Sequence, residues 1–68
     1  KNSIMIIDGT WACEGHTIEF KTNEDDTCRI YESYEASQQE MTSHMRVSID
    51  NAITYQERYI KLGYDKIS

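Results

Sequence analysis

The 68-residue sequence predicts an α+β fold: a small antiparallel sheet of three or four strands (residues 3–34) packed against one long C-terminal helix (about 38–62). Apolar and polar residues alternate in the first half, as they do in half-buried strands. In the second half, apolar residues recur at spacings of three, four and seven, which is typical of an amphipathic helix. The chain has no proline and three glycines, and its length fits a single small domain over residues 1–68.

The first part of the predicted sheet is a hairpin. Ser3–Ile7 is apolar and rich in β-branched residues, and Asp8-Gly9 follows it. Asp-Gly favours a two-residue turn because both residues tolerate the positive φ angles of type I′. Thr10–Cys13 is then the return strand, and Glu14-Gly15 is either a second tight turn or a bulge in a longer strand.

Two further segments continue the predicted sheet. Thr17–Lys21 and Cys28–Tyr34 both alternate, and the polar loop Asn23–Asp26 separates them. The alternation puts their apolar residues on one face, namely Ile18, Phe20, Cys28 and Ile30. Tyr31 then lies on the opposite, solvent-facing side.

The predicted helix has both a start and a stop signal. Ser37–Glu40 has the pattern of a capping box, in which Ser37 and Glu40 satisfy each other's free backbone N–H groups. Gly63 follows the last apolar position and suits the left-handed residue that ends a helix. The apolar stripe between them consists of Met41, Met45, Ile49, Ala52, Ile53 and Ile60.

The predicted helix is longer than the sheet that it covers. Twenty-five residues span about 37 Å, whereas a seven-residue strand spans about 23 Å. The overhang carries a second apolar stripe, made of Tyr55, Tyr59 and Leu62. Either the helix bends back near Ser48–Asn51, or these residues form a homodimer interface, which is the interpretation we favour. The alternative is that the tyrosine rings lie on the surface of a monomer with their hydroxyls in water.

The charge of the chain is acidic and uneven. Twelve Asp and Glu residues against seven Lys and Arg give a net charge of −5, and residues 1–34 hold seven of the acids. This balance argues against direct nucleic-acid binding, which depends on clustered Lys and Arg. The longest apolar run is Ile4–Ile7, so no membrane partner is expected. A more specific alternative is a DNA mimic whose carboxylates are Glu14, Glu19, Glu24, Asp25, Asp26 and Glu32.

Two cysteines and two histidines form the only set of residues that resembles a metal site. Cys13 and His16 have the spacing of half a zinc site, but Cys28 and His44 stand alone in the sequence. A Cys13–Cys28 disulfide is the better alternative, because closing a 15-residue loop contributes about 3 kcal/mol in the chain-entropy model. Two free, buried thiols are favoured over both, and no metal or other cofactor is predicted.

The sequence holds no recognisable catalytic motif, so we expect a protein that is not an enzyme. Cys13 with His16 or His44 lacks an obvious orienting group, and Asp25-Asp26 is expected to be solvated in a polar loop. Trp11 is either the largest core residue or an exposed anchor for a partner. Tyr31 with Glu19 and Glu32 predicts an aromatic and acidic patch; the alternative is a cross-strand pair that only stabilises the sheet.

These observations predict a non-enzymatic protein-interaction module, an inhibitor or regulator of a larger protein or complex. Its format is similar to that of small accessory proteins of phages and other mobile elements. The expected partner is a protein with a basic surface, and one candidate class is nucleic-acid-binding proteins. A cytoplasmic location is favoured. The alternatives are a secreted or periplasmic structural protein stapled by Cys13–Cys28, and a zinc-bound module. The expected partner-binding residues are Trp11, Glu19, Glu24, Asp25, Asp26, Tyr31 and Glu32.

Overall fold

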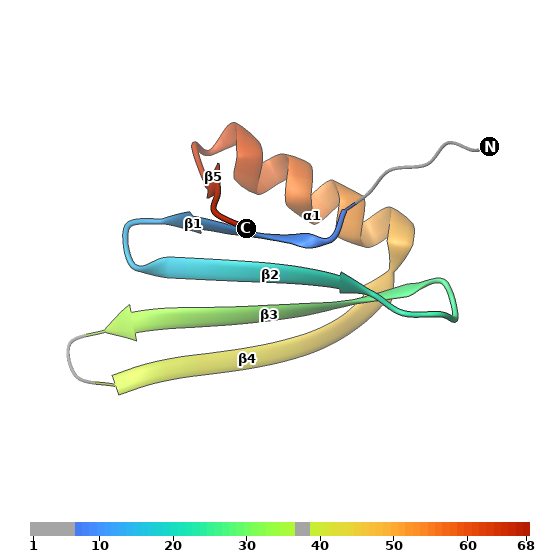
Figure 1. Ribbon diagram of the computed structural model, residues 1–68, viewed down its shortest axis with the longest axis horizontal. Coiled ribbons are helices and arrows are strands. Elements are labelled where there is room, and N and C mark those ends of the chain that lie inside the picture. The colour runs from blue at the N-terminus through green and yellow to red at the C-terminus, as the bar shows by residue number, and fades with distance from the viewer. Residues whose placement is uncertain (1–6, 37–38) are drawn as a thin grey trace.

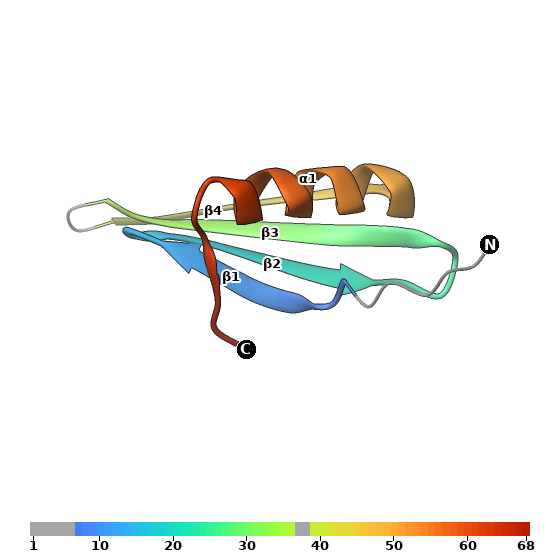
Figure 2. The same ribbon diagram turned by 90° about the horizontal axis from the view of Figure 1, so that it is seen from above.

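The computed structural model describes residues 7–36 and 39–68 and has an α+β fold, as predicted. Five antiparallel strands form one sheet in the order β4-β3-β2-β1-β5, and a single helix packs on one of its faces (Figures 1 and 2). The predicted architecture is therefore confirmed, with more strands and a shorter helix. The elements are β1 (Gly9–Cys13), β2 (His16–Thr22), β3 (Thr27–Ala36), β4 (Gln39–Ser48), α1 (Ile49–Lys61) and β5 (Asp65–Lys66).

The first hairpin turns at Glu14-Gly15 and not at Asp8-Gly9. Glu14 and Gly15 have φ angles of 45° and 85°, the two positive values that a type I′ turn requires. Asp8 instead accepts hydrogen bonds from the backbone N–H and the hydroxyl of Thr22, each at 2.9 Å. The predicted Asp8-Gly9 turn is therefore wrong, because the aspartate ties the chain to the end of β2 and Gly9 begins β1. Of the predicted strand Ser3–Ile7, residues 3–6 lie outside the described residues, and Ile7 is buried just before β1.

The predicted alternation in β2 and β3 is confirmed. On the face turned towards α1, Ile18 and Phe20 of β2 and Cys28 and Ile30 of β3 are buried, whereas the residues between them on the other face remain accessible. Trp11 belongs to the buried face: it is 7% exposed and meets the Phe20 ring edge-on at 5.7 Å between centroids. Of the two interpretations of Trp11, the core residue is correct. The buried apolar core is Ile7, Trp11, Ile18, Phe20, Cys28, Ile30 and Ala52.

The predicted start of the helix is wrong, because Gln39–Ser48 is a strand. β4 pairs with β3 without a bulge, from Ala36 opposite Gln39 to Thr27 opposite Ser48. A spacing of four residues satisfies the strand period of two as well as the helix period, so the Met41–Met45–Ile49 spacing does not separate the two structures. The continuous ladder of backbone hydrogen bonds to β3 favours the strand. Ser37, the expected cap, lies outside the described residues.

The helix begins at the end of β4, where the predicted bend was placed. The Ser48 hydroxyl accepts from the backbone N–H of Asn51 at 3.2 Å and caps the first turn. α1 has 13 residues and spans about 20 Å, so the overhang expected beyond the sheet is absent. Tyr55 and Tyr59 pack partly buried against the core of their own chain, and Leu62 is 65% exposed. The homodimer remains a prediction, without the overhang that first suggested it.

No helix in the described part of the chain is long and apolar enough to cross a membrane.

Candidate functional site

The most connected polar cluster of the structure begins at the end of α1. Gly63 adopts a φ of 103°, and its N–H donates to the carbonyl of Ile60 at 3.0 Å. The next N–H, of Tyr64, donates to the carbonyl of Tyr59 at 3.1 Å. These two bonds form a Schellman motif, so the predicted role of Gly63 is confirmed. The motif reverses the chain and brings the Tyr64 ring to 4.9 Å from Tyr59.

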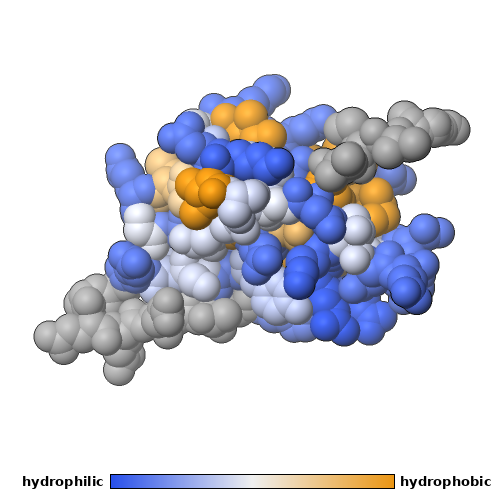
Figure 3. All heavy atoms as spheres, viewed as in Figure 1, coloured by the Kyte–Doolittle hydropathy of each residue, from blue (hydrophilic) through white to orange (hydrophobic). Residues whose placement is uncertain are grey.

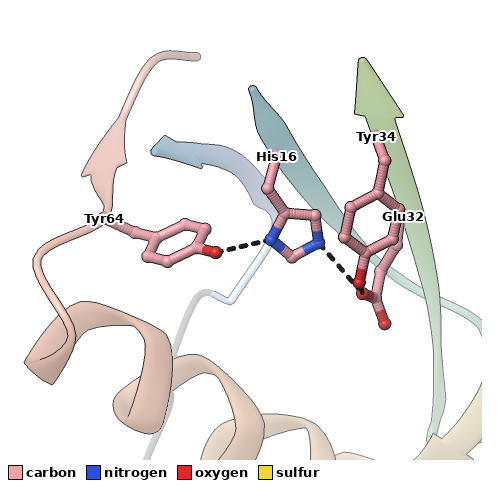
Figure 4. Close-up of polar contacts among 4 residues, drawn as sticks. All are labelled: His16, Glu32, Tyr34 and Tyr64. Atoms are coloured by element: carbon pink, nitrogen blue, oxygen red, sulfur yellow. Dashed lines mark hydrogen bonds and ion pairs between the residues drawn. The ribbon is translucent and has the colours of Figure 1, made fainter. Parts of the chain in front are cut away.

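His16, the first residue of β2, is the centre of this cluster (Figure 4). It is 8% exposed, its Nδ1 lies 2.5 Å from the Tyr64 hydroxyl, and its Nε2 lies 3.0 Å from Glu32 Oε1. Tyr34 stacks on the imidazole at 4.3 Å and donates from its hydroxyl to the same Glu32 oxygen at 3.0 Å. We call these residues the His16 network: His16, Glu32, Tyr34, Tyr59 and Tyr64.

The partners of His16 determine the position of its proton. A carboxylate can only accept hydrogen bonds, so Nε2 carries a hydrogen and donates to Glu32. In the neutral imidazole, Nδ1 then accepts from the Tyr64 hydroxyl. The histidine is thus held between β3 and the segment after α1, and it joins the C-terminal part of the chain to the sheet.

The tyrosines of the network favour their neutral form. Burial raises the pKa of Tyr59 and of Tyr64. The hydrogen bond to Glu32 raises the pKa of Tyr34, with further contributions from burial and the nearby negative charge. The hydrogen-bonded chain Tyr64–His16–Glu32 has the same order as a nucleophile, its base and the carboxylate that orients the base. The raised pKa of Tyr64 favours its protonated form, in which the hydroxyl donates to His16.

The network changes the expected partner surface. Glu32 was expected beside Tyr31 and Glu19, but it lies on the helix side of β3, where it holds His16. Adjacent residues of a strand point to opposite faces, so Glu32 and Tyr31 cannot share one patch. Trp11 is in the core, and the expected patch keeps Glu19 and Tyr31, which pair directly across β2 and β3.

The face of the sheet turned away from α1, which we call the open face, carries Glu19 and Tyr31. Figure 3 shows that most of the surface on the side of the molecule drawn there is hydrophilic or near neutral, with hydrophobic residues in small separate spots. Tyr31 stacks on His44 of β4, with ring centroids 4.8 Å apart and an angle of 23° between the planes. Tyr31 is therefore on the solvent side of the sheet, as predicted, and it does form a cross-strand pair.

Three basic residues lie in a row beside this aromatic pair, and the sequence alone did not predict the row. Lys21 on β2 is directly opposite Arg29 on β3, and Arg29 is directly opposite Arg46 on β4. We call these three residues the basic row. Alternation alone places Lys21 and Arg29 on the open face, but only the register of the strands brings the three together.

The expected acidic loop lies at the same end of the sheet as the start of α1. Glu24, Asp25 and Asp26 are exposed between β2 and β3. The Thr27 hydroxyl donates to Asp25 at 2.5 Å and lowers the pKa of that carboxyl, and nearby Arg46 adds to the effect. Two other exposed acids lie at this end. Asp8 accepts hydrogen bonds from Thr22 at the end of β2, and Asp50 is in the first turn of α1. We call the group the acidic end: Asp8, Glu24, Asp25, Asp26 and Asp50.

The structure does not support the disulfide or the zinc site. Cys13 and Cys28 are both free. Cys13 is opposite His16 at one end of β2, and Cys28 is opposite Thr22 at the other end, about 20 Å away along the strand. A disulfide needs Cα atoms within about 7 Å. Among the side chains that the structure describes, no group of three or more His, Cys, Asp or Glu residues is arranged to hold a metal ion.

No protein-family model matches the chain, and neither a curated protein nor a solved structure matches it significantly.

Proposed function

We propose that this protein is a non-enzymatic binding module that regulates or inhibits a protein partner with a basic surface. The observation that carries the proposal is the acidic end. Its five carboxylates come from the segment before β1, the β2–β3 loop and the first turn of α1, and all five residues are exposed. Carboxylates from three segments concentrate negative charge at one end of the fold. Such a pattern attracts a complementary basic surface and selects its orientation.

The acidic end is more suitable for this role than the residues expected from the sequence. Trp11 is buried in the core, and Glu32 is bonded to His16 in the His16 network, so neither is available to a partner. Glu24, Asp25 and Asp26 remain available. Asp25 contacts Arg46 at 3.7 Å, and both side chains are more than half exposed, so this pair is weak and a partner's cation can compete for the carboxylate.

The test is affinity capture from cells of the source organism at low salt, followed by quantitative mass spectrometry. The charge-reversal variant Glu24→Lys with Asp26→Lys is compared with Glu14→Lys and Glu35→Lys. The control pair is also exposed and makes the same change in net charge at the opposite end of the sheet. We expect recovery of the partner to fall about tenfold or more with the first pair and to persist with the second. Equal recovery with both pairs, or no partner with the unmodified protein, would reject the proposal.

A further inference from the structure

The basic row is an unfavourable arrangement for the fold alone. Lys21, Arg29 and Arg46 are exposed and occupy opposite positions on three neighbouring strands. Side chains in such positions start about 5 Å apart, and like charges there are destabilising. The protein has five more acids than bases, so the row is not a product of a generally basic composition. A feature that opposes folding in this way calls for a role in binding.

Neighbouring carboxylates leave most of the row available. Glu19 lies in the next row of the open face, and Glu24 and Asp25 lie at its edge. Only one ion pair to the row is present among the described side chains, the exposed contact of 3.7 Å between Arg46 and Asp25. Arg29 and Arg46 also line an open hollow of about 340 Å³ together with Asn23, Glu24 and Asp25. Two guanidinium groups beside a hollow suit an oxyanion, because their paired N–H groups match phosphate geometry.

The aromatic pair next to the row indicates which phosphate compound fits. Tyr31 and His44 are each two residues from Arg29 and Arg46 along their strands, a distance of about 7 Å. Phosphate groups and planar bases are neighbours along a nucleic-acid strand, and bases stack on aromatic side chains. The hollow beside Arg29 and Arg46 is open to solvent, whereas a free nucleotide requires a concave site that encloses it. The combination therefore favours a polymer.

We propose that the open face binds a short segment of single-stranded nucleic acid, with phosphates at Lys21, Arg29 and Arg46 and a base against Tyr31 and His44. This site uses other side chains than the acidic end, so it goes beyond the protein-binding proposal. The net charge of −5 opposes approach from a distance, but charges more than about 10 Å away are largely screened at 0.1 M salt. Glu24 and Asp25 line the same hollow as the arginines, so their repulsion of a phosphate is not screened and weakens binding. Binding is accordingly local, salt-dependent and of roughly micromolar affinity.

The test is fluorescence anisotropy with a labelled oligothymidylate of about 12 nucleotides, titrated at several NaCl concentrations. Three phosphate contacts predict a slope of about −2 for log K against log salt concentration. Arg29→Gln with Arg46→Gln should weaken binding and reduce the slope to about −0.7, because one contact remains. The control is Arg58→Gln with Lys61→Gln, which removes the same charge from exposed positions on α1 and should retain the original slope.

Two further variants separate stacking and competition from general attraction of anions. Tyr31→Leu should weaken binding about fivefold or more through the loss of stacking. Asp25→Asn should strengthen it about two- to fivefold, because Arg46 loses its competing carboxylate, whereas Glu57→Gln on α1 should not. Circular dichroism confirms that each variant is folded.

The proposal is wrong if the unmodified protein does not bind the oligonucleotide at low salt. It is also wrong if the double variant at Arg29 and Arg46 and the control at Arg58 and Lys61 have equal effects, or if polyglutamate competes as well as unlabelled oligothymidylate does. The last result would indicate an acidic peptide as the ligand. These measurements use a defined probe and no captured protein, so their failure leaves the acidic end to be judged by its own experiment.

Discussion

At the residue scale, His16 has more polar and aromatic side-chain contacts than any other residue whose side chain the structure describes. It is nearly buried and uses both ring nitrogens, one on Tyr64 and one on Glu32. His16→Ala removes the partner of the Tyr64 hydroxyl and one of the two donors to Glu32, and it opens a space beneath the Tyr34 ring. We expect a loss of about 2–4 kcal/mol in the free energy of unfolding, measured by urea denaturation.

His44→Ala is the matched control for that measurement. His44 also stacks on a tyrosine, but it is exposed on the open face. Its removal should change the free energy of unfolding by about 0.5 kcal/mol or less. Equal losses for the two histidines would contradict the role given to the His16 network.

The tyrosines of the His16 network should make the stability of the folded protein depend on pH in the alkaline range. The pKa values of Tyr34, Tyr59 and Tyr64 are raised in the folded protein, and they return to about 10 on unfolding. The unfolded chain therefore releases these protons at lower pH than the folded protein does. The contribution of the three tyrosines to the free energy of unfolding is complete below pH 10, and it is lost as the pH rises through their pKa values in the folded protein. Burial raises the pKa of Cys28 in the same direction, so the decline begins near its ordinary value of 9.0. We expect the urea midpoint to fall progressively above about pH 9.

A variant identifies the groups responsible for this decline. Tyr64→Phe removes one titrating phenol, so the urea midpoint should fall less steeply with pH than in the unmodified protein. A midpoint that stays constant up to pH 11, or an unchanged slope in Tyr64→Phe, would contradict the assignment.

At the element scale, the strands whose two faces differ could be predicted, and the fourth strand could not. The predicted strands Thr17–Lys21 and Cys28–Tyr34 lie within β2 and β3, and their apolar residues alternate with accessible ones. Gln39–Ser48 has its methionines four apart, a spacing that both a strand and a helix allow. The pairing of β4 with β3 decides between them, and a local pattern carries no information on that pairing. For the same reason, neither the basic row nor the contact between His16 and Tyr64 could be predicted, because each joins residues that are far apart in sequence.

The start of α1 provides a direct test of the corrected boundary. The Ser48 hydroxyl caps Asn51, and Asp50 lies in the first turn, where a negative charge is favourable. Ser48→Ala should lower the free energy of unfolding by about 1 kcal/mol, measured by urea denaturation. The capping box expected from the sequence would place this loss at Ser37. A larger loss in Ser37→Ala than in Ser48→Ala would therefore restore the longer helix.

At the scale of the whole molecule, the small core bears on the oligomeric state. A chain of 68 residues buries only about 60% of the surface that it exposes when unfolded, so a second subunit is one way to add stability. The described core consists of seven apolar residues, beside the buried polar pair His16 and Gln56. Three large aliphatic residues remain exposed near the C-terminal end of the chain, namely Ile60, Leu62 and Ile67.

Leu62 is the best position to test the predicted homodimer. Of the three residues expected at the interface, Tyr55 and Tyr59 pack against their own core, so Tyr59→Glu would disturb the fold and the interface together. Leu62 is 65% exposed, and Leu62→Glu changes only the surface. If the homodimer forms through this end of α1, light scattering should give twice the chain mass of 8.0 kDa, and Leu62→Glu should give the monomer. Glu57→Lys is a control on another exposed position of the helix and should retain the dimer. A monomeric mass for the unmodified protein at high micromolar concentration would show that this small core is sufficient without a second subunit.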